Sequence, residues 1–136
     1  YKSNISFDGL LLLDVLEHLN NPAQVLNECA DNLKQGGYIF IHTPHHRGLG
    51  TRYKKILHKY GFKKDYKHFG FPQHLYAFDK KSLKEILKKT GFEAVHFESW
   101  SNKITRGKVN IFNYILVKLV KVFCLSDYIV CVARKN

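Results

Sequence analysis

The sequence predicts an α/β fold built on a largely parallel sheet with flanking helices. Two short apolar runs, 10–13 and 38–43, lack the alternation of a half-exposed strand. Such runs are typical of strands that are buried on both faces of a parallel sheet. The stretch between the runs has helical periodicity, so the three form a strand–helix–strand unit, whose crossover should be right-handed.

The composition fits one domain or part of a larger one, with 136 residues and 45% hydrophobic residues. The chain has no Met and does not begin with one, so we expect an excerpt or a processed piece. The net charge of +11 favours an anionic partner, namely a nucleic acid, an acidic lipid surface or a phosphorylated substrate. The alternative is a lysine-rich surface without such a partner.

The three cysteines, Cys29, Cys124 and Cys131, form no C-x-x-C pair, which argues against a zinc knuckle or a disulfide framework. Buried free thiols in a reducing compartment are the expected state. The sequence contains neither a recognisable signal peptide nor an apolar run of about 18 residues. We therefore expect a cytoplasmic protein.

The first strand carries a group of reactive side chains at its end. Asp14, Glu17 and His18 follow the run 10–13, and ligands of open α/β sheets bind beyond the carboxyl ends of the strands. Two carboxylates and an imidazole at that edge are placed for chemistry. The alternative is structural: Asp14 caps the following turn and His18 packs as a half-buried histidine.

The helix between the first two strands has a clear start signal. Asn21 can cap it, Pro22 takes its first position and Gln24 can complete a capping box. We expect Gly36–Gly37 to end this helix and Pro44 to stop the strand 38–43.

The segment 45–75 is basic and aromatic, and it has no clean periodicity. We interpret it as an insertion or lid on the ligand side of the sheet, with a short helix over 53–60. Its Gly48-Leu49-Gly50 lacks the third glycine of a phosphate-binding loop.

After this segment the sequence again predicts regular helices and strands. Asp79 should cap a helix that runs to Gly91, and 92–100 and 127–133 read as strands. Within the insertion 101–125, residues 109–125 form an amphipathic pattern. That helix could pack over the sheet, lie in a homodimer interface, or lie on an anionic membrane surface.

Several ordered motifs together resemble the class I S-adenosylmethionine-dependent methyltransferases, especially the ubiquinone-biosynthesis O-methyltransferase group. The matching stretches are Phe7-Asp8, Val15-Leu16-Glu17-His18-Leu19, Leu33-Lys34-Gln35-Gly36-Gly37, Thr43-Pro44, His74-Leu75-Tyr76-Ala77-Phe78 with Ser82-Leu83, and Thr90-Gly91-Phe92-Glu93. The resemblance covers nearly the whole chain. It is least secure in the basic segment and in 101–125.

The resemblance implies a Rossmann-like fold in which residues 1–136 are the C-terminal portion of one methyltransferase domain. Its strands would be numbers four to seven of a seven-stranded, mostly parallel sheet, with the last strand antiparallel. The cofactor would be S-adenosylmethionine, bound mainly by a glycine-rich loop and an acidic residue that precede Tyr1. We therefore expect the 136 residues alone to bind the cofactor poorly and to be inactive.

The resemblance also suggests site residues. The end of the fourth strand would lie beside the methionine part of the cofactor, which by position implies Leu13, Asp14 and Val15, with His18 just behind. His18 is the natural candidate for a catalytic base, because its reference pKa is near neutral. Four other histidines could serve as the base instead, because the family binds its substrate on this side, or could simply belong to the surface or lid: His42, His45, His46 and His74.

The same three residues, Asp14, Glu17 and His18, could also bind a divalent metal. In the ubiquinone-type relatives, an acidic residue, a glutamate and a histidine at the spacing of Asp14, Glu17 and His18 are associated with a metal that acidifies a catechol-like hydroxyl. We favour the metal-free alternative, in which Asp14 holds the cofactor's ammonium group and Glu17 makes a structural hydrogen bond, because three ligands so close in sequence need a favourable turn to converge.

The expected function is methyl transfer to a small-molecule or lipid-like acceptor, at oxygen, by an enzyme peripheral to the membrane if the acceptor is a lipid. A nucleic-acid methyltransferase is the second hypothesis, favoured by the charge and the basic aromatic segment. Against it, the first strand ends in Asp14-Val15-Leu16 rather than in an Asn/Asp-Pro-Pro-Tyr type motif. A non-catalytic, methyltransferase-like binding module is the third.

Overall fold

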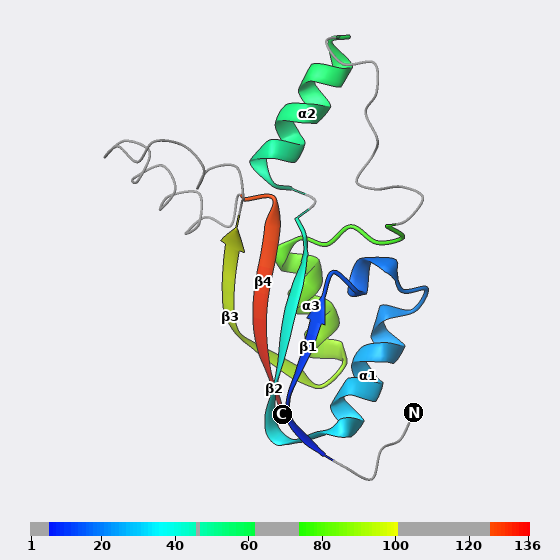
Figure 1. The fold of residues 1–136 in the computed structure, drawn as a ribbon, viewed down its shortest axis with the longest axis vertical. Coiled ribbons are helices and arrows are strands. Elements are labelled where there is room, and N and C mark those ends of the chain that lie inside the picture. Colours follow the sequence, from blue (N-terminus) through cyan, green and yellow to red (C-terminus); the bar gives the residue numbers. More distant parts are fainter. Residues whose placement is uncertain (1–5, 46, 62–73, 101–125) are drawn as a thin grey trace, which may run out of the picture.

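The computed structural model describes residues 6–45, 47–61, 74–100 and 126–136, which form a four-stranded sheet with helices (Figure 1). In chain order the elements are β1 (Phe7–Leu13), the 3-10 helix η1 (Leu16–His18), α1 (Pro22–Asn32), β2 (Leu33–Pro44), α2 (Leu49–Lys59), α3 (Lys80–Lys89), β3 (Phe92–Trp100) and β4 (Tyr128–Lys135). The predicted α/β class and the strand–helix–strand unit are both confirmed.

The strands are ordered β1-β2-β4-β3 across the sheet. β1 and β2 are parallel, with Leu13 opposite His42, so their carboxyl ends lie at the same edge. β4 is antiparallel to both β2 and β3. The described sheet is therefore mixed, with one parallel pair, and its last strand is antiparallel as expected.

The hydrophobic core lies on one face of the sheet, beneath α1 and α3. Leu26 of α1 and Leu83 and Leu87 of α3 are fully buried, each worth about 1.5–3 kcal/mol relative to exposure. They pack with one side-chain row of the strands, which includes Ile39, Ile41, Ile129, Cys131 and Ala133. Burial raises the pKa of the Cys131 thiol to about 12, so this cysteine is an inert core residue.

The opposite face of the sheet is open in the described part of the chain. Leu11 and Leu13 are 69% and 60% exposed, and Phe40 beside them is 42% exposed. The expectation that the first strand is buried on both faces is therefore wrong here. Successive side chains of a strand point to opposite faces, and α1 and α3 cover only the face that Leu10 and Leu12 share.

The expected end of the first helix is also wrong. α1 ends at Asn32, and Gly36 and Gly37 lie inside β2. Gly36 has a φ of +74°. A Cβ on Gly37 would lie 2.9 Å from the Lys34 carbonyl oxygen, so this close approach of backbone excludes a side chain. The two glycines thus serve an irregular stretch of the strand, where the pairing with β1 shifts register, rather than a helix end.

At the start of α1, the predicted Asn21 cap is confirmed but the predicted capping box is not. Asn21 Oδ1 accepts a hydrogen bond from the Gln24 backbone N–H at 3.1 Å, as expected for the N-cap. The Gln24 side chain donates to Glu28 Oε1 instead of returning to the cap, so the expected capping box is not formed.

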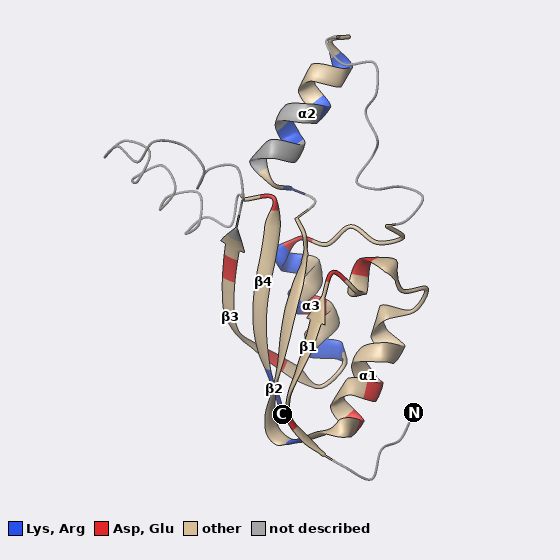
Figure 2. Ribbon diagram, viewed as in Figure 1, with Lys and Arg blue, Asp and Glu red and all other residues tan. Residues whose placement is uncertain are grey.

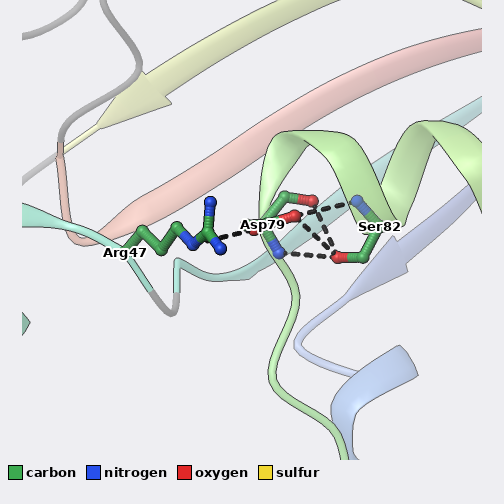
Figure 3. A network of polar contacts seen from close by, with 3 residues as sticks. All are labelled: Arg47, Asp79 and Ser82. Carbon is green, nitrogen blue, oxygen red and sulfur yellow. Dashed lines mark hydrogen bonds and ion pairs between the residues drawn. The ribbon is translucent and has the colours of Figure 1, made fainter.

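Asp79 caps α3 as predicted, and Figure 3 shows the network around it. Asp79 Oδ1 accepts from the Ser82 backbone N–H at 2.8 Å, and Ser82 Oγ accepts from the Asp79 N–H at 2.9 Å. Arg47 Nε lies 3.2 Å from Asp79 Oδ2. The hydrogen bond from the Ser82 backbone is the largest of the effects that lower the pKa of Asp79. This network joins the end of the β2 segment to α3.

The predicted basic insertion contains α2, which begins earlier than the expected helix and projects beyond the carboxyl ends of β1 and β2 (Figure 1). Lys and Arg lie on α2 and α3, whereas α1 carries only acidic charges (Figure 2). Residues 62–73 of the insertion and the amphipathic stretch 109–125 lie outside the described residues. In the part of the chain that the structure describes, no helix is long and apolar enough to cross a membrane.

Candidate functional site

Five polar side chains gather where β1 and β2 end, as the strand order requires. Asp14 directly follows β1, and Glu17 and His18 belong to η1. His42 lies near the end of β2, and His74 belongs to the segment that precedes α3. The structure therefore divides the predicted group. Asp14 contacts His42, whereas Glu17 and His18 form a second cluster with His74.

Asp14 makes the first pair with His42. Its carboxylate oxygen Oδ1 lies 2.9 Å from His42 Nδ1, and its backbone N–H donates to the His42 carbonyl at 2.9 Å. Asp14 has a φ of +53°, which is uncommon for a residue other than glycine. The side chain does not cap η1, whose N-cap is Val15, so the capping alternative for Asp14 is wrong.

Glu17 is the centre of the second group. Its side chain is almost completely buried, and Oε2 accepts a hydrogen bond from Thr43 Oγ1 at 3.0 Å. Oε1 has no hydrogen-bond partner among the described residues. Because a buried polar atom without a partner costs about 1–3 kcal/mol, the site favours a ligand that contacts this oxygen.

His18 and His74 flank that oxygen. The imidazole rings are 4.7 Å apart in an edge-to-face arrangement, and His18 Nε2 lies 4.0 Å from Glu17 Oε1. The segment with His74 is fixed at this point because the backbone N–H groups of Leu75 and Tyr76 both donate to the Glu17 carbonyl oxygen, at 2.7 and 3.1 Å. The His18 side chain is 40% exposed and packs against His74, which fits the half-buried histidine of the structural alternative as well as a ligand role.

Glu17, His18 and His74 have the geometry of a possible cation site. One ligand atom from each lies within 4.8 Å of the others. A carboxylate and two imidazoles suit several divalent transition metals and leave coordination positions for other ligands. Asp14, the third ligand suggested by the resemblance, is not in this cluster, and His74 takes its place.

Among the histidines that the structure describes, His45 is the deeply buried one, at 4% exposure. Its Nδ1 lies 3.0 Å from the Ser126 carbonyl oxygen, and burial lowers its pKa below the ordinary histidine value. The expectation of a surface or lid histidine is therefore wrong for His45, which connects the end of β2 to the start of the β4 segment. A role in acceptor binding stays a prediction. His46 lies outside the described residues.

An apolar hollow of about 370 Å³ adjoins the Asp14–His42 pair on the open face of the sheet. Its lining residues are Leu11, Leu13, Asp14, Phe40, Ile41, His42 and Val130. Of the residues expected near a cofactor, Leu13 and Asp14 line this hollow, while Val15 and His18 do not. Thr43 was not predicted as a site residue, although Thr43-Pro44 is one of the stretches that carry the family resemblance.

Comparison with known proteins places this chain among methyltransferases. Residues 2–97 match the family model described as a methyltransferase domain. The ubiquinone biosynthesis O-methyltransferase of Dechloromonas aromatica is 27% identical over 116 residues, which are 81% of this chain and 49% of that protein. A protein with the same name from Nitrosococcus oceani is 28% identical over 116 residues, 81% of this chain and 48% of its own length. The chain thus spans about half the length of these relatives.

A solved structure supports the fold. A SAM-dependent methyltransferase from Thermotoga maritima superposes with a TM-score of 0.63 at 15% identity, covering 99% of this chain and 60% of its own. The match to the family model extends over more than half of the chain. The chain therefore belongs to the methyltransferase domain family, whose cofactor is S-adenosylmethionine.

Proposed function

We propose that the full-length protein transfers the methyl group of S-adenosylmethionine to a hydroxyl oxygen of a small-molecule acceptor. One observation carries the proposal: two polar clusters, Asp14–His42 and Glu17–His18–His74, lie at the carboxyl ends of two parallel strands, and an apolar hollow adjoins the first. Such an edge is where open α/β sheets bind their ligands.

The acceptor class is supported by the relatives and by the hollow. The relatives that match 81% of this chain are named as ubiquinone biosynthesis O-methyltransferases. The hollow is lined by Leu11, Leu13, Phe40 and Val130, which suits an acceptor with an apolar, lipid-like part. We propose oxygen as the methylated atom on this basis.

The residues at the end of β1 fit part of a cofactor site. Leu13 offers an apolar surface, and Asp14 offers a half-exposed carboxylate suited to an ammonium group. When bound, S-adenosylmethionine supplies a methyl group activated by a sulfonium charge. Leu13, Asp14, Val15 and His18 remain the proposed contacts, and β1 to β4 are proposed to correspond to strands four to seven of the complete sheet.

A divalent cation fits the Glu17 cluster better than the sequence suggested. Glu17, His18 and His74 would hold it, because Glu17 Oε1 is buried without a partner among the described residues and both imidazoles lie beside it. A bound cation would act as a Lewis acid that lowers the pKa of an acceptor hydroxyl. This proposal replaces the metal-free arrangement that the spacing alone favoured.

The other hypotheses from the sequence remain testable. A nucleic-acid acceptor is supported by the net charge of +11 and by the basic residues on α2. Binding to a membrane surface or to a second copy of the chain would involve residues 109–125. A non-catalytic module would keep the fold without methyl transfer.

The test is methyl transfer by the purified full-length protein from methyl-labelled S-adenosylmethionine to a panel of acceptors. The panel contains catechols and phenols with and without an isoprenoid tail, the corresponding anilines, and short RNA and DNA. We expect labelled phenolic ethers, with faster transfer to the tailed acceptors. Calorimetric titration with S-adenosylmethionine measures cofactor binding independently.

Each other result points to a different hypothesis. Labelled nucleic acid would favour the second hypothesis, and its binding should weaken steeply with salt. Cofactor binding with labelled anilines only would reject oxygen as the acceptor atom. Failure to bind the cofactor would reject methyl transfer altogether and leave the binding module.

A further inference from the structure

The Asp14–His42 pair is built from two adjacent strands. Leu13 of β1 is paired with His42 of β2, and Asp14, the next residue, bonds His42 through both its backbone N–H and its carboxylate, each at 2.9 Å. The two contacts fix the position of the carboxylate relative to the imidazole. An aspartate at this point can therefore orient the histidine ring.

The backbone of Asp14 is strained in order to make this pair. A φ of +53° is strained outside glycine, although aspartate tolerates it better than most residues. Strain of this kind persists where the surrounding structure over-determines it, often at functional sites. Here the two hydrogen bonds to His42 hold the conformation.

The ring of His42 is held from a second side as well. Tyr128, at the start of β4, stacks on it with ring centroids 5.0 Å apart and an interplanar angle of 17°. Because an aspartate carboxylate only accepts hydrogen bonds, this contact favours the tautomer of a neutral His42 in which Nδ1 carries the proton and Nε2 the lone pair. The His42 side chain is 20% exposed and lines the apolar hollow, so a small molecule can reach it.

We propose that His42 is the general base of the methyl transfer and that Asp14 is its positioning residue. This inference rests on the proposed function. The acceptor O–H bond breaks and its proton moves to His42 Nε2, while an oxygen lone pair forms the new bond to the methyl carbon. The carbon–sulfur bond breaks with its electron pair on sulfur, which neutralises the sulfonium. The imidazolium later gives the proton to water.

The same geometry argues against His18, the base that the sequence suggested. The His18 Nε2 lies beside the buried Glu17 Oε1, at 4.0 Å, and its ring packs edge-to-face on His74. Those contacts suit a cation ligand. His42, in contrast, has a carboxylate at 2.9 Å, which favours the imidazolium that forms during proton transfer.

The test compares full-length wild type with His42→Gln, Asp14→Asn and the control His96→Gln, which changes an exposed histidine on β3. The substrates are phenols whose hydroxyl pKa ranges from well above to below the assay pH. For the least acidic phenol we expect His42→Gln to lose at least about 10²-fold in kcat, since general-base catalysis is typically worth 10²–10⁴-fold. The loss should vanish for phenols that are already ionised, because these need no base. His96→Gln should match wild type with every phenol.

A second readout does not depend on turnover. Nitrogen-15 NMR of histidine-labelled protein, with the His42 signals assigned by their loss in His42→Gln, reports which ring nitrogen carries the proton. We expect the Nδ1–H tautomer in wild type and a shift towards the other tautomer in Asp14→Asn. An Nε2–H tautomer in wild type would overturn the positioning role of Asp14.

The outcomes separate this inference from the function on which it rests. If wild type methylates phenols and His42→Gln loses the same factor for all of them, His42 is not the base. Equal rates for wild type and His42→Gln lead to the same conclusion. If wild type methylates no hydroxyl acceptor, the proposed function fails and this inference fails with it.

Discussion

Thr43 Oγ1 donates a hydrogen bond to Glu17 Oε2 at 3.0 Å, and both side chains are buried. Thr43 comes from β2 and Glu17 from η1, so this bond joins the turn after β1 to the neighbouring strand. It also fixes the carboxyl group whose second oxygen faces His18 and His74. The orientation of the Glu17 carboxylate in its cluster therefore depends on the Thr43 hydroxyl.

Replacing Thr43 with valine should destabilise the protein. The variant removes the hydroxyl and leaves both Glu17 oxygens without a partner among the described residues, which costs about 1–3 kcal/mol. Urea denaturation of the full-length protein measures the change in the free energy of unfolding. Thr43→Ser keeps the hydroxyl and should retain most of that stability. Equal losses in both variants would show that packing, rather than the hydrogen bond, is responsible.

A divalent cation should bind at Glu17, His18 and His74. We expect Mn²⁺ or Zn²⁺ to bind the chelated full-length protein, and Glu17→Gln or His74→Gln to weaken that binding by about 10-fold or more, because each removes a ligand of the cluster. Calorimetric titration gives the affinities, and His96→Gln on β3 is the matched control. Unchanged affinity in the Glu17 and His74 variants would exclude this cluster, and full methyl transfer after exhaustive chelation would exclude a metal in the reaction.

His45 should make the protein less stable under mildly acidic conditions. Burial lowers its pKa below the reference value of 6.5, so the unfolded chain binds the proton more readily than the folded one. The contribution of the neutral residue to stability is complete above pH 6.5 and is lost as the pH falls from 6.5 towards the folded pKa. Urea midpoints at pH 7.5 and pH 5.5 should differ more in wild type than in His45→Asn. An equal pH dependence in both proteins would contradict this.

Asp79 should also make the protein less stable as the pH falls, but at lower pH, and here the folded state favours the charged form of the residue. Its pKa is lowered from 3.8, first by the Ser82 backbone hydrogen bond. The stability that its carboxylate contributes is present above pH 3.8 and is lost as the pH falls through the folded pKa. Asp79→Ala should cost about 1 kcal/mol at pH 7 through loss of the helix cap. It should also lessen the decline in stability below pH 4.

The control for Asp79 is Arg47→Ala. The Arg47 side chain is 69% exposed, and ion pairs of exposed groups contribute little. Its removal should leave the free energy of unfolding nearly unchanged at pH 7. A loss as large as that of Asp79→Ala would assign the stability to the ion pair rather than to the cap.

The sequence by itself determined the elements and their order. The apolar runs of the first two strands, the Asn21–Pro22 start of α1 and the Asp79 cap of α3 are local signals, and each depends on groups within a few residues. For the same reason the group Asp14, Glu17 and His18 could be located at the end of the first strand. Its members are neighbours in sequence, and the end of a strand is recognisable.

Only the tertiary structure decided which side chains meet. Asp14 contacts His42 across 28 residues, and Glu17 contacts Thr43 across 26, because β1 and β2 are parallel neighbours in a particular register. His74 reaches the Glu17 cluster only because its segment bonds the Glu17 carbonyl. The exposure of Leu11 and Leu13 was likewise beyond the sequence, since an apolar residue does not record which face of the sheet the helices cover.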